Sequence, residues 1–349
     1  MRLACRARER FPWCRDLPEE EFLLHVLPHR GSDEPFQRWR RRFYDALAEA
    51  ALRLEKPEEV ALFVNRLAAA IFRYRGDTGW EDEGALTLLS THEGRCEDMV
   101  NLVLAMLRAV GLPASHVYTP AWAKGDGNHA WCGVALGEEF LSFMGCEPRA
   151  EPPFFRCYMD EIVAAKVYFR SPFATLDVTS RFGRSCELAV AVGRDHAERE
   201  VHLDVLNSGG WRTVGGGRVD GEGVARFGPV GCREAILLLV SQNAAGFDAS
   251  GVRAACDPFV LSPDGTVRPL AGRGEPVEAT LAPGRLAPGR EYAIAAWTDS
   301  RWTIAGRFRS DGEGGALLSL VPDRVHQVLD GDRPAARPFV LEGGSIVFY

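Results

Sequence analysis

The chain has 349 residues and a formal net charge of −7, with 46% hydrophobic and 26% charged residues. This length predicts two or three domains rather than a single core. The acidic balance argues against a nucleic-acid or anionic-membrane binder, because either needs a basic face. No apolar run approaches the roughly 18 residues that cross a bilayer. We therefore expect neither a nucleic-acid partner nor a membrane span.

The first part of the chain is predicted to be helical. A short apolar helix is expected over residues 22–27, and apolar residues recur at helical spacing over 36–54 and 58–74. Pro57 suits the first turn of the last of these helices. We interpret residues 1–75 as a helical leader that packs on the domain behind it.

The most apolar stretch covers residues 97–110, in which nearly every position is hydrophobic. A helix that is apolar on nearly every face lies inside a domain, and Gly111 supplies its stop. Short strands are expected after it, over 115–119, 129–136 and 140–145. One buried helix followed by antiparallel strands predicts an α+β catalytic domain over residues 76–184.

Beyond about residue 184 the chain changes to short alternating strands punctuated by glycine. Strands are expected over 187–192, 201–206, 225–227 and 235–240. Turns are indicated by the pairs Gly209-Gly210, Asp220-Gly221 and Asp264-Gly265. This pattern predicts a β-sandwich over residues 185–270 and a small C-terminal β domain over 271–349.

One cysteine stands at the start of the buried helix. The nine cysteines are irregularly spaced and include no CxxC pair, which argues against a zinc ribbon or a thioredoxin-like redox site. Cys96, however, directly precedes the apolar stretch. The positive end of the helix dipole and the unpaired N–H groups there favour a thiolate, the nucleophilic form of the side chain. The same N–H groups are suited to hold the oxyanion of a tetrahedral intermediate.

Two further residues complete a candidate catalytic site. His129 begins a predicted strand, where it can accept the thiol proton and return it to a leaving amine. Glu147 follows 18 residues later (147 − 129), which leaves room for a strand, a turn and a return strand. A carboxylate there can fix the tautomer of the histidine. Cys96, His129 and Glu147 are the predicted catalytic residues; Asp177 either orients the histidine instead or caps a strand end.

A zinc site is the main chemical alternative, with zinc-ligand residue types at His92, Cys96, His129, Cys132 and Cys146. Gly94 disfavours a helix through residues 92–96. Cys132 lies three residues beyond His129, so on a strand the two side chains point to opposite faces. We therefore expect no metal and no cofactor.

The roles of a few neighbouring residues stay open. Trp131 is expected to pack in the core, while Trp80 or Trp122 is a candidate for assisting the oxyanion. Arg95 is either a solvated charge or a contact for an acidic substrate. Asn128 is expected to shape the turn before the histidine strand.

The chain resembles the transglutaminase-like superfamily, a papain-related group with a Cys-His-Asp triad, in the order of four motifs: GRCED, GLPA, NHAW and GCEP. Its leader resembles that of bacterial proteins in which β-sandwich domains follow this core. Carried over by position, Cys96 is the nucleophile and His129 the base, and Glu147 stands where the superfamily usually has aspartate. Glutamate is one methylene longer, so its strand must lie farther back or its rotamer must fold.

The resemblance implies a cysteine enzyme that forms a thioester with a carboxamide or peptide carbonyl of a protein, peptide or glycopeptide. Hydrolysis by a peptidase or amidase is favoured over transfer to an amine, and removal of glycans at asparagine amides is also open. The alternative is an inactive domain of this family in a scaffold or binding protein, whose β domains bind glycan, peptide or cell wall.

The location of the protein is predicted from the same resemblance. Residues 1–13 are rich in arginine and lack the apolar segment of a signal peptide. Either the protein is cytoplasmic or its true start lies upstream. Because similar bacterial proteins are commonly exported, we favour a location outside the cytoplasm.

Overall fold

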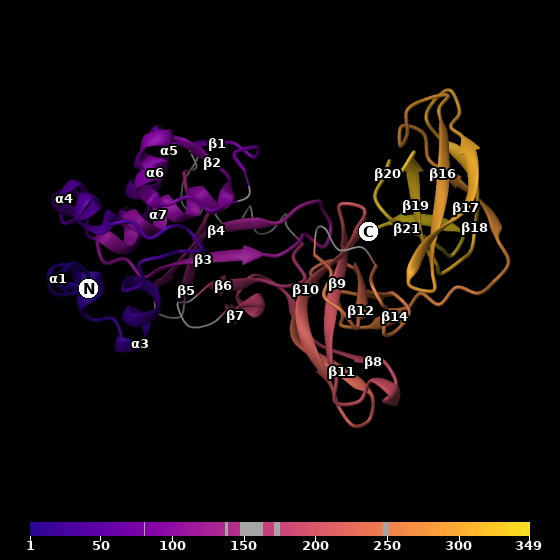
Figure 1. Cartoon of the computed structure of the whole chain (residues 1–349), viewed down its shortest axis with the longest axis horizontal. Coiled ribbons are helices and arrows are strands. Elements are labelled where there is room, and N and C mark those ends of the chain that lie inside the picture. The colour runs from indigo at the N-terminus through magenta and orange to yellow at the C-terminus, as the bar shows by residue number, and fades with distance from the viewer. Residues whose placement is uncertain (80, 137–138, 147–162, 171–174, 247–250) are drawn as a thin grey trace. The chain divides into compact units, whose positions relative to one another are not determined.

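The computed structural model describes residues 1–79, 81–136, 139–146, 163–170, 175–246 and 251–349. It divides into two compact units. Unit 1 comprises the described residues of 1–119, 128–162 and 167–182, and unit 2 those of 120–127, 163–166 and 183–349. Helices and a sheet form unit 1, and antiparallel sheets form unit 2 (Figure 1). The predicted α+β class is confirmed, whereas the finer division at residues 75, 184 and 270 stays a prediction.

The amphipathic helices predicted over 36–54 and 58–74 are present as α4 (Trp39–Ala51) and α5 (Pro57–Ile71), and the apolar stretch over 97–110 forms α7 (Cys96–Ala109). The remaining helical segments of unit 1 are α1 (Arg2–Arg10), α2 (Pro12–Arg15), α3 (Glu19–Glu21), the π-helical turn η1 (Phe22–Val26), α6 (Ala85–Thr91) and the short 3₁₀ turn η2 (Thr179–Arg181). The arginine-rich start of the chain is thus helical, and it buries Ala4 and Ala7. No helix among the described residues is both long and apolar enough to cross a membrane.

A five-stranded antiparallel sheet lies against α7. Its order is β5-β4-β3-β6-β7, with β3 at Ala114–Thr119, β4 at His129–Leu136, β5 at Glu139–Phe143, β6 at Tyr168–Arg170 and β7 at Thr175–Asp177. A short parallel pair, β1 (Arg73–Tyr74) and β2 (Glu93–Gly94), precedes α7. Because α7 packs on β3, β4, α4, α5 and α6, it is buried along nearly its whole length, as its composition predicts.

Two buried arginines join the leader to α7. Arg40 of α4 donates from Nη1 to the Arg108 carbonyl at 2.8 Å and from Nη2 to the Val26 carbonyl at 2.9 Å. Arg108 of α7 donates from Nε to the Ala114 carbonyl at 2.9 Å and from Nη1 to the Arg30 carbonyl at 2.7 Å. A planar guanidinium with five donors is suited to binding several carbonyls at once. These contacts fix the turn of chain over residues 26–30 to the helix that carries Cys96.

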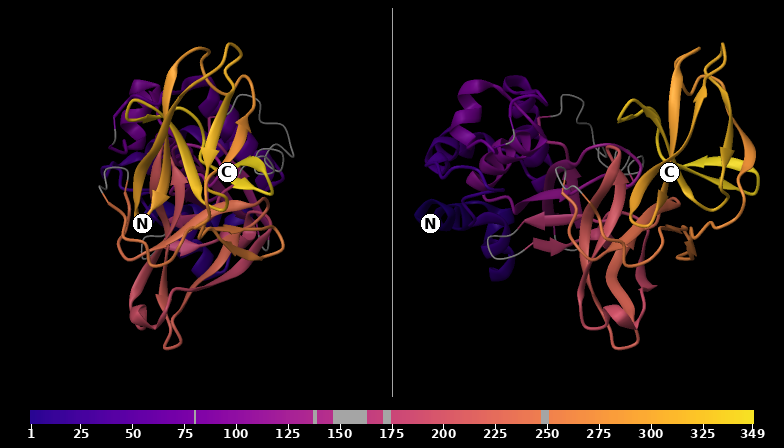
Figure 2. Two further views of the ribbon diagram at one scale, coloured as in Figure 1. Left: turned by 90° about the vertical axis from the view of Figure 1, so that its right-hand side faces the viewer. Right: turned by 45° about the vertical axis from the view of Figure 1, so that its right-hand side comes forward.

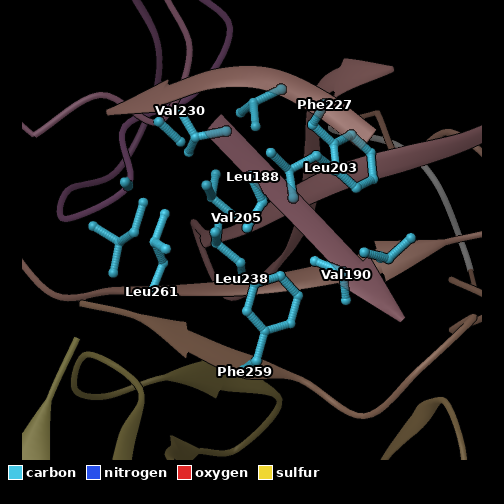
Figure 3. Close-up of a cluster of buried hydrophobic side chains, with 14 of the residues drawn as sticks. Leu188, Val190, Leu203, Val205, Phe227, Val230, Leu238, Phe259 and Leu261 are labelled. Atoms are coloured by element: carbon cyan, nitrogen blue, oxygen red, sulfur yellow. The ribbon is translucent and has the colours of Figure 1, made fainter. Parts of the chain in front are cut away.

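Unit 2 begins with a seven-stranded antiparallel sheet of order β14-β13-β12-β9-β10-β11-β8. Its strands are β8 (Ser185–Ala191), β9 (Glu200–Asn207), β10 (Gly210–Val219), β11 (Val224–Gly231), β12 (Ile236–Ser241), β13 (Phe259–Leu261) and β14 (Val267–Pro269), with the 3₁₀ turn η3 (Arg194–His196) after β8. Leu188 of β8 and Phe259 of β13 come from near opposite edges of the sheet, yet they share one buried cluster (Figure 3). The sheet therefore wraps around its own core, as a sandwich does.

The remaining strands gather into two smaller sheets (Figure 2). One pairs β15 (Val277–Leu281) with β18 (Ala316–Leu320). The other has the order β17-β16-β19-β21-β22, formed by Arg301–Arg309, Glu291–Thr298, Val325–Asp330, Phe339–Glu342 and Ser345–Phe348, with β20 (Arg333–Pro334) beside β19. Trp211, Trp297 and Trp302 pack edge to face, with ring centroids 5.7 and 5.4 Å apart. The tryptophans after residue 184 are therefore packing residues.

Candidate active site

The first turn of α7 is held by a buried carboxylate. Asp98, which is 1% exposed, accepts hydrogen bonds from the backbone N–H of Arg95 at 2.9 Å and of Glu83 at 2.9 Å. The Arg95 bond is one half of a capping box, since the third helical residue reaches back to the N-cap residue. The Glu83 bond ties the same turn to the segment before α6. Asp98 therefore fixes the position of Cys96, the first residue of the helix.

Arg95 is part of this framework. Its Nη2 lies 2.9 Å from Asp82 and its Nη1 lies 4.0 Å from Glu97, and its side chain is 14% exposed. A guanidinium that is paired in this way and so little exposed is not a solvated charge, so that expectation for Arg95 is corrected. The other expectation, a contact for an acidic substrate, stays a prediction.

The Cys96 thiol is buried, and it donates a hydrogen bond to Oε2 of Glu97 at 3.1 Å. Burial and the adjacent Glu97 carboxylate raise the pKa of Cys96 to about 12. Hydrogen bonds from the backbone N–H groups of Ala130 and Glu97 act in the opposite direction and are outweighed. The resting side chain is thus a thiol at neutral pH, which differs from the thiolate that the helix N-terminus alone predicts. The contact with Ala130 brings the start of β4 to the sulfur.

A second contact joins the same two elements. Nδ2 of Asn128, the residue before His129, donates to Oε1 of Glu97 at 3.1 Å. Glu97, which follows Cys96, is thereby hydrogen-bonded to Asn128, which precedes His129. Cys96 and His129 are brought to one place in the fold by this pair, although the thiol itself donates to Glu97 rather than to the imidazole.

The His129 ring is bonded to the next strand of the sheet. Its Nε2 lies 2.8 Å from Sδ of Met144, the residue after β5. Burial lowers the pKa of His129 to about 4, although the Glu97 carboxylate acts against this. The thioether is an uncharged acceptor, so this contact orients the ring without favouring the imidazolium. At neutral pH the site therefore combines a neutral thiol with a neutral imidazole.

A protein-family model matches part of the chain. Residues 45–143 match the family model described as the transglutaminase-like superfamily. This segment is a transglutaminase-like domain. The matched range contains α7 and β4, the elements that carry Cys96 and His129.

Two solved structures are similar over parts of the chain. A candidate cysteine protease from Cytophaga hutchinsonii shares 18% identity at a TM-score of 0.31, and the match covers 44% of this chain and 49% of that one. The transglutaminase of red sea bream shares 12% identity at a TM-score of 0.34, with 92% of this chain and 78% of that one covered. The chain thus spans about half the length of the first of these structures. No curated protein matches it.

The structure describes some of the other residues that the sequence analysis singled out. Glu147 and Trp80 lie outside the described residues. Gly145 and Cys146 have positive φ values of 74° and 53°, so the extended backbone of β5 ends just before Glu147. Asp177 accepts hydrogen bonds from the backbone N–H of Thr179 at 3.0 Å and from its hydroxyl at 2.6 Å, and thus caps the turn after β7.

The zinc alternative depends on a helical pair that does not form. His92 ends α6 in the left-handed conformation and bonds the Ile71 carbonyl through Nδ1 at 2.8 Å, whereas Cys96 begins α7. The described part of the chain holds no cluster of three or more His, Cys, Asp or Glu side chains arranged as metal ligands. Trp131 is fully buried beside Phe182 with centroids 5.4 Å apart, as expected of a core residue.

Sequence reasoning missed Glu97 and Met144. Glu97 looked like one more acidic residue in the first turn of a helix, where acidic residues are common. Met144 looked like an apolar strand residue. Neither role is visible without the contacts between α7, β4 and β5.

Proposed function

We propose that the transglutaminase-like domain is a cysteine enzyme that cleaves a carboxamide or peptide bond through a thioester. The observation that carries this proposal is the meeting of the α7 N-terminus with the start of β4, marked by the Glu97–Asn128 hydrogen bond at 3.1 Å. It unites a cysteine at a helix N-terminus with a histidine that is neutral, and so able to accept a proton, at physiological pH.

In the proposed reaction, His129 takes the thiol proton as the Cys96 sulfur attacks the carbonyl carbon. Because Nε2 is directed at Met144, we assign this proton to Nδ1. The helix N-terminal N–H groups stabilise the oxyanion of the tetrahedral intermediate. The carbon–nitrogen bond then breaks, the amine leaves with the proton from His129, and a thioester remains. Water, activated by the same histidine, releases the acid and regenerates the thiol.

Glu147 is our proposed third catalytic residue, with the role of orienting the histidine. It follows Met144 by three residues, beyond the turn that ends β5. A carboxylate near the ring would stabilise the imidazolium that forms after proton transfer, which the Met144 thioether cannot do. Hydrolysis is favoured over amine transfer, and the substrate is proposed to be a protein, peptide or glycopeptide.

The test is direct capture of the thioester. The purified chain is mixed with a set of glutamine- and asparagine-containing peptides, quenched in acid and weighed by intact mass spectrometry. We expect an adduct of the acyl group's mass on the wild-type chain and none on Cys96→Ala or His129→Ala. Glu147→Gln should reduce the adduct without abolishing it. Cys5→Ala, which removes an exposed thiol, is the matched control and should keep the adduct.

A parallel reaction with a lysine-containing peptide separates the two possible outcomes of the thioester. Formation of the amide with the lysine amine at the expense of the acid indicates amine transfer, whereas the acid alone indicates hydrolysis. An adduct that persists in Cys96→Ala would contradict the proposal. Absence of any adduct with every peptide would favour the alternative, a non-catalytic scaffold or binding protein whose β domains hold glycan, peptide or cell wall.

A further inference from the structure

Glu97 contacts both halves of the proposed site. Its Oε2 accepts the Cys96 thiol hydrogen at 3.1 Å, and its Oε1 accepts a hydrogen bond from Asn128 at 3.1 Å. The nearest guanidinium nitrogen of Arg95 is 4.0 Å from Oε2. The Glu97 side chain is 14% exposed, so solvent screens this carboxylate only partly.

The bond between the thiol and the carboxylate has a chemical consequence. A thiol donates to a carboxylate only while it keeps its proton, because a thiolate would face a like charge at contact distance. A like charge this close disfavours ionisation, and a partly buried site strengthens the effect. The Glu97 contact therefore opposes the step that creates the nucleophile.

The other charged side chains near Cys96 have partners of their own, whereas Glu97 is hydrogen-bonded to the Cys96 sulfur. Asp98 is engaged with the backbone N–H groups of Glu83 and Arg95, and the Arg95 guanidinium is paired with Asp82. Two histidines of the sheet interact electrostatically with Glu97: His129 on β4 and the buried His116 on β3. Both are neutral at physiological pH, because burial lowers the pKa of each to about 4.

We propose that Glu97 is a positioning residue that restrains the nucleophile: its carboxylate accepts the thiol hydrogen and so holds Cys96 as a thiol in the free enzyme. The restraint keeps the free protein slow to react with electrophiles, and the thiolate forms only when the sulfur leaves Glu97 for the histidine. This inference rests on the proposed role of Cys96 and adds a regulator of the same site.

The experiment measures the reactivity of Cys96 itself. Full-length protein is treated with iodoacetamide between pH 6 and 10, and peptide mapping by mass spectrometry follows alkylation of Cys96 separately from the other cysteines. Glu97→Gln keeps the size of the side chain and an oxygen for Asn128 but removes the charge. We expect the pH profile to move down by at least one unit, so that alkylation at pH 7 is about tenfold faster or more.

Two further variants make the result specific. Glu93 lies three residues before Cys96, and its exposed carboxylate is paired with Arg75. Glu93→Gln removes this negative charge and should leave the pH profile of Cys96 alkylation unchanged. Asn128→Ala removes the tether but keeps the charge, so alkylation should stay slow. A Glu97→Gln profile that coincides with the wild type overturns the inference. So does an Asn128→Ala variant that accelerates alkylation as much as Glu97→Gln.

Alkylation does not require turnover, so the two proposals fail separately. If Glu97→Gln accelerates alkylation while the wild type forms no thioester, the restraint is real and the proposed catalysis is wrong. If the thioester forms in the wild type but Glu97→Gln leaves alkylation unchanged, the catalysis stands and the restraint is wrong. If Glu97→Gln does not fold, Glu97→Asp is used instead. This variant keeps a carboxylate at position 97, so alkylation of Cys96 should stay slow, and faster alkylation would count against the inference.

Discussion

The ionisation state of Cys96 depends on opposing effects: the helix N-terminus favours the thiolate, whereas burial and the Glu97 carboxylate favour the thiol. A helix N-terminus stabilises an anion by roughly 0.3–1 kcal/mol in exposed settings. The rise in the pKa of Cys96 from 9.0 to about 12 corresponds to about 4 kcal/mol in favour of the thiol. Burial and the Glu97 carboxylate therefore dominate the dipole. The proposed chemistry needs a base that removes the proton during attack, and a neutral imidazole meets that need.

The pH dependence of turnover follows from the same residues. His129 acts as a base only while neutral, and burial lowers its pKa to about 4. We expect kcat/KM on a peptide that forms the thioester to stay high down to about pH 5 and to fall only near pH 4. On the alkaline side the rate should not decline through pH 9, because Cys96 ionises only near pH 12.

Initial rates between pH 3.5 and 9 test this expectation, with circular dichroism at each pH to confirm that the chain remains folded. An acid limb centred near pH 6.5 would contradict it, because that is the ordinary value for a histidine in water.

At the scale of single elements, α5 and α7 begin with the same arrangement in different surroundings. In α5, Glu59 accepts hydrogen bonds from the backbone N–H groups of Glu55 at 3.0 Å and Lys56 at 3.2 Å, and these bonds are exposed. In α7, Asp98 makes two such bonds while almost fully buried. Water replaces the lost partner at an exposed cap but not at a buried one, so the two caps differ in energy.

A pair of alanine variants measures that difference. Glu59→Ala should lower the free energy of unfolding by about 0.5–1 kcal/mol, as expected for an exposed cap. Asp98→Ala removes a buried carboxylate that accepts hydrogen bonds from two partly buried N–H groups, and should lower it by about 2–4 kcal/mol. Urea titrations at pH 7 followed by circular dichroism give both values. Equal losses for the two variants would show that burial of the α7 cap adds nothing.

The whole molecule contains histidines that burial keeps neutral. His25 and His116 in unit 1 and His326 in unit 2 are at most 4% exposed, and burial lowers the pKa of each to about 4. In the unfolded chain a histidine has a pKa near 6.5. Between these two values the unfolded chain binds more protons than the folded one, so stability falls as the pH decreases from about 6.5 to 4. Above pH 6.5 these groups contribute no pH dependence.

His116 is suited to test this, because both of its ring nitrogens are buried and neither has a hydrogen-bond partner among the described residues. His116→Leu should keep or slightly raise the free energy of unfolding at pH 7, since an unsatisfied polar group is removed. At pH 4.5 the variant should exceed the wild type by about 2–3 kcal/mol, the part of the acid loss that His116 causes. Urea titrations at both values decide the matter. A variant that loses as much stability as the wild type on acidification would contradict the prediction.

The sequence by itself determined the class of fold and the family resemblance. The apolar periods of 36–54, 58–74 and 97–110 predicted α4, α5 and α7, and the range 129–136 predicted β4 at its observed bounds. These predictions succeed because burial leaves a local pattern in the sequence. Burial on one face of a helix gives apolar residues at helical spacing, and burial on all faces gives a continuous apolar stretch. The helix at 2–10 was missed because arginines mask its two buried alanines.

Only the tertiary structure decided the partners of the proposed catalytic residues. The Cys96 thiol is hydrogen-bonded to Glu97, and the His129 ring contacts Sδ of Met144. The Cys96 thiol keeps its proton at neutral pH. These facts depend on which side chains α7, β4 and β5 bring together and on how much water they exclude. Such contacts join residues far apart in the sequence, such as Asn128 and Glu97 at 31 positions, and no local pattern predicts them.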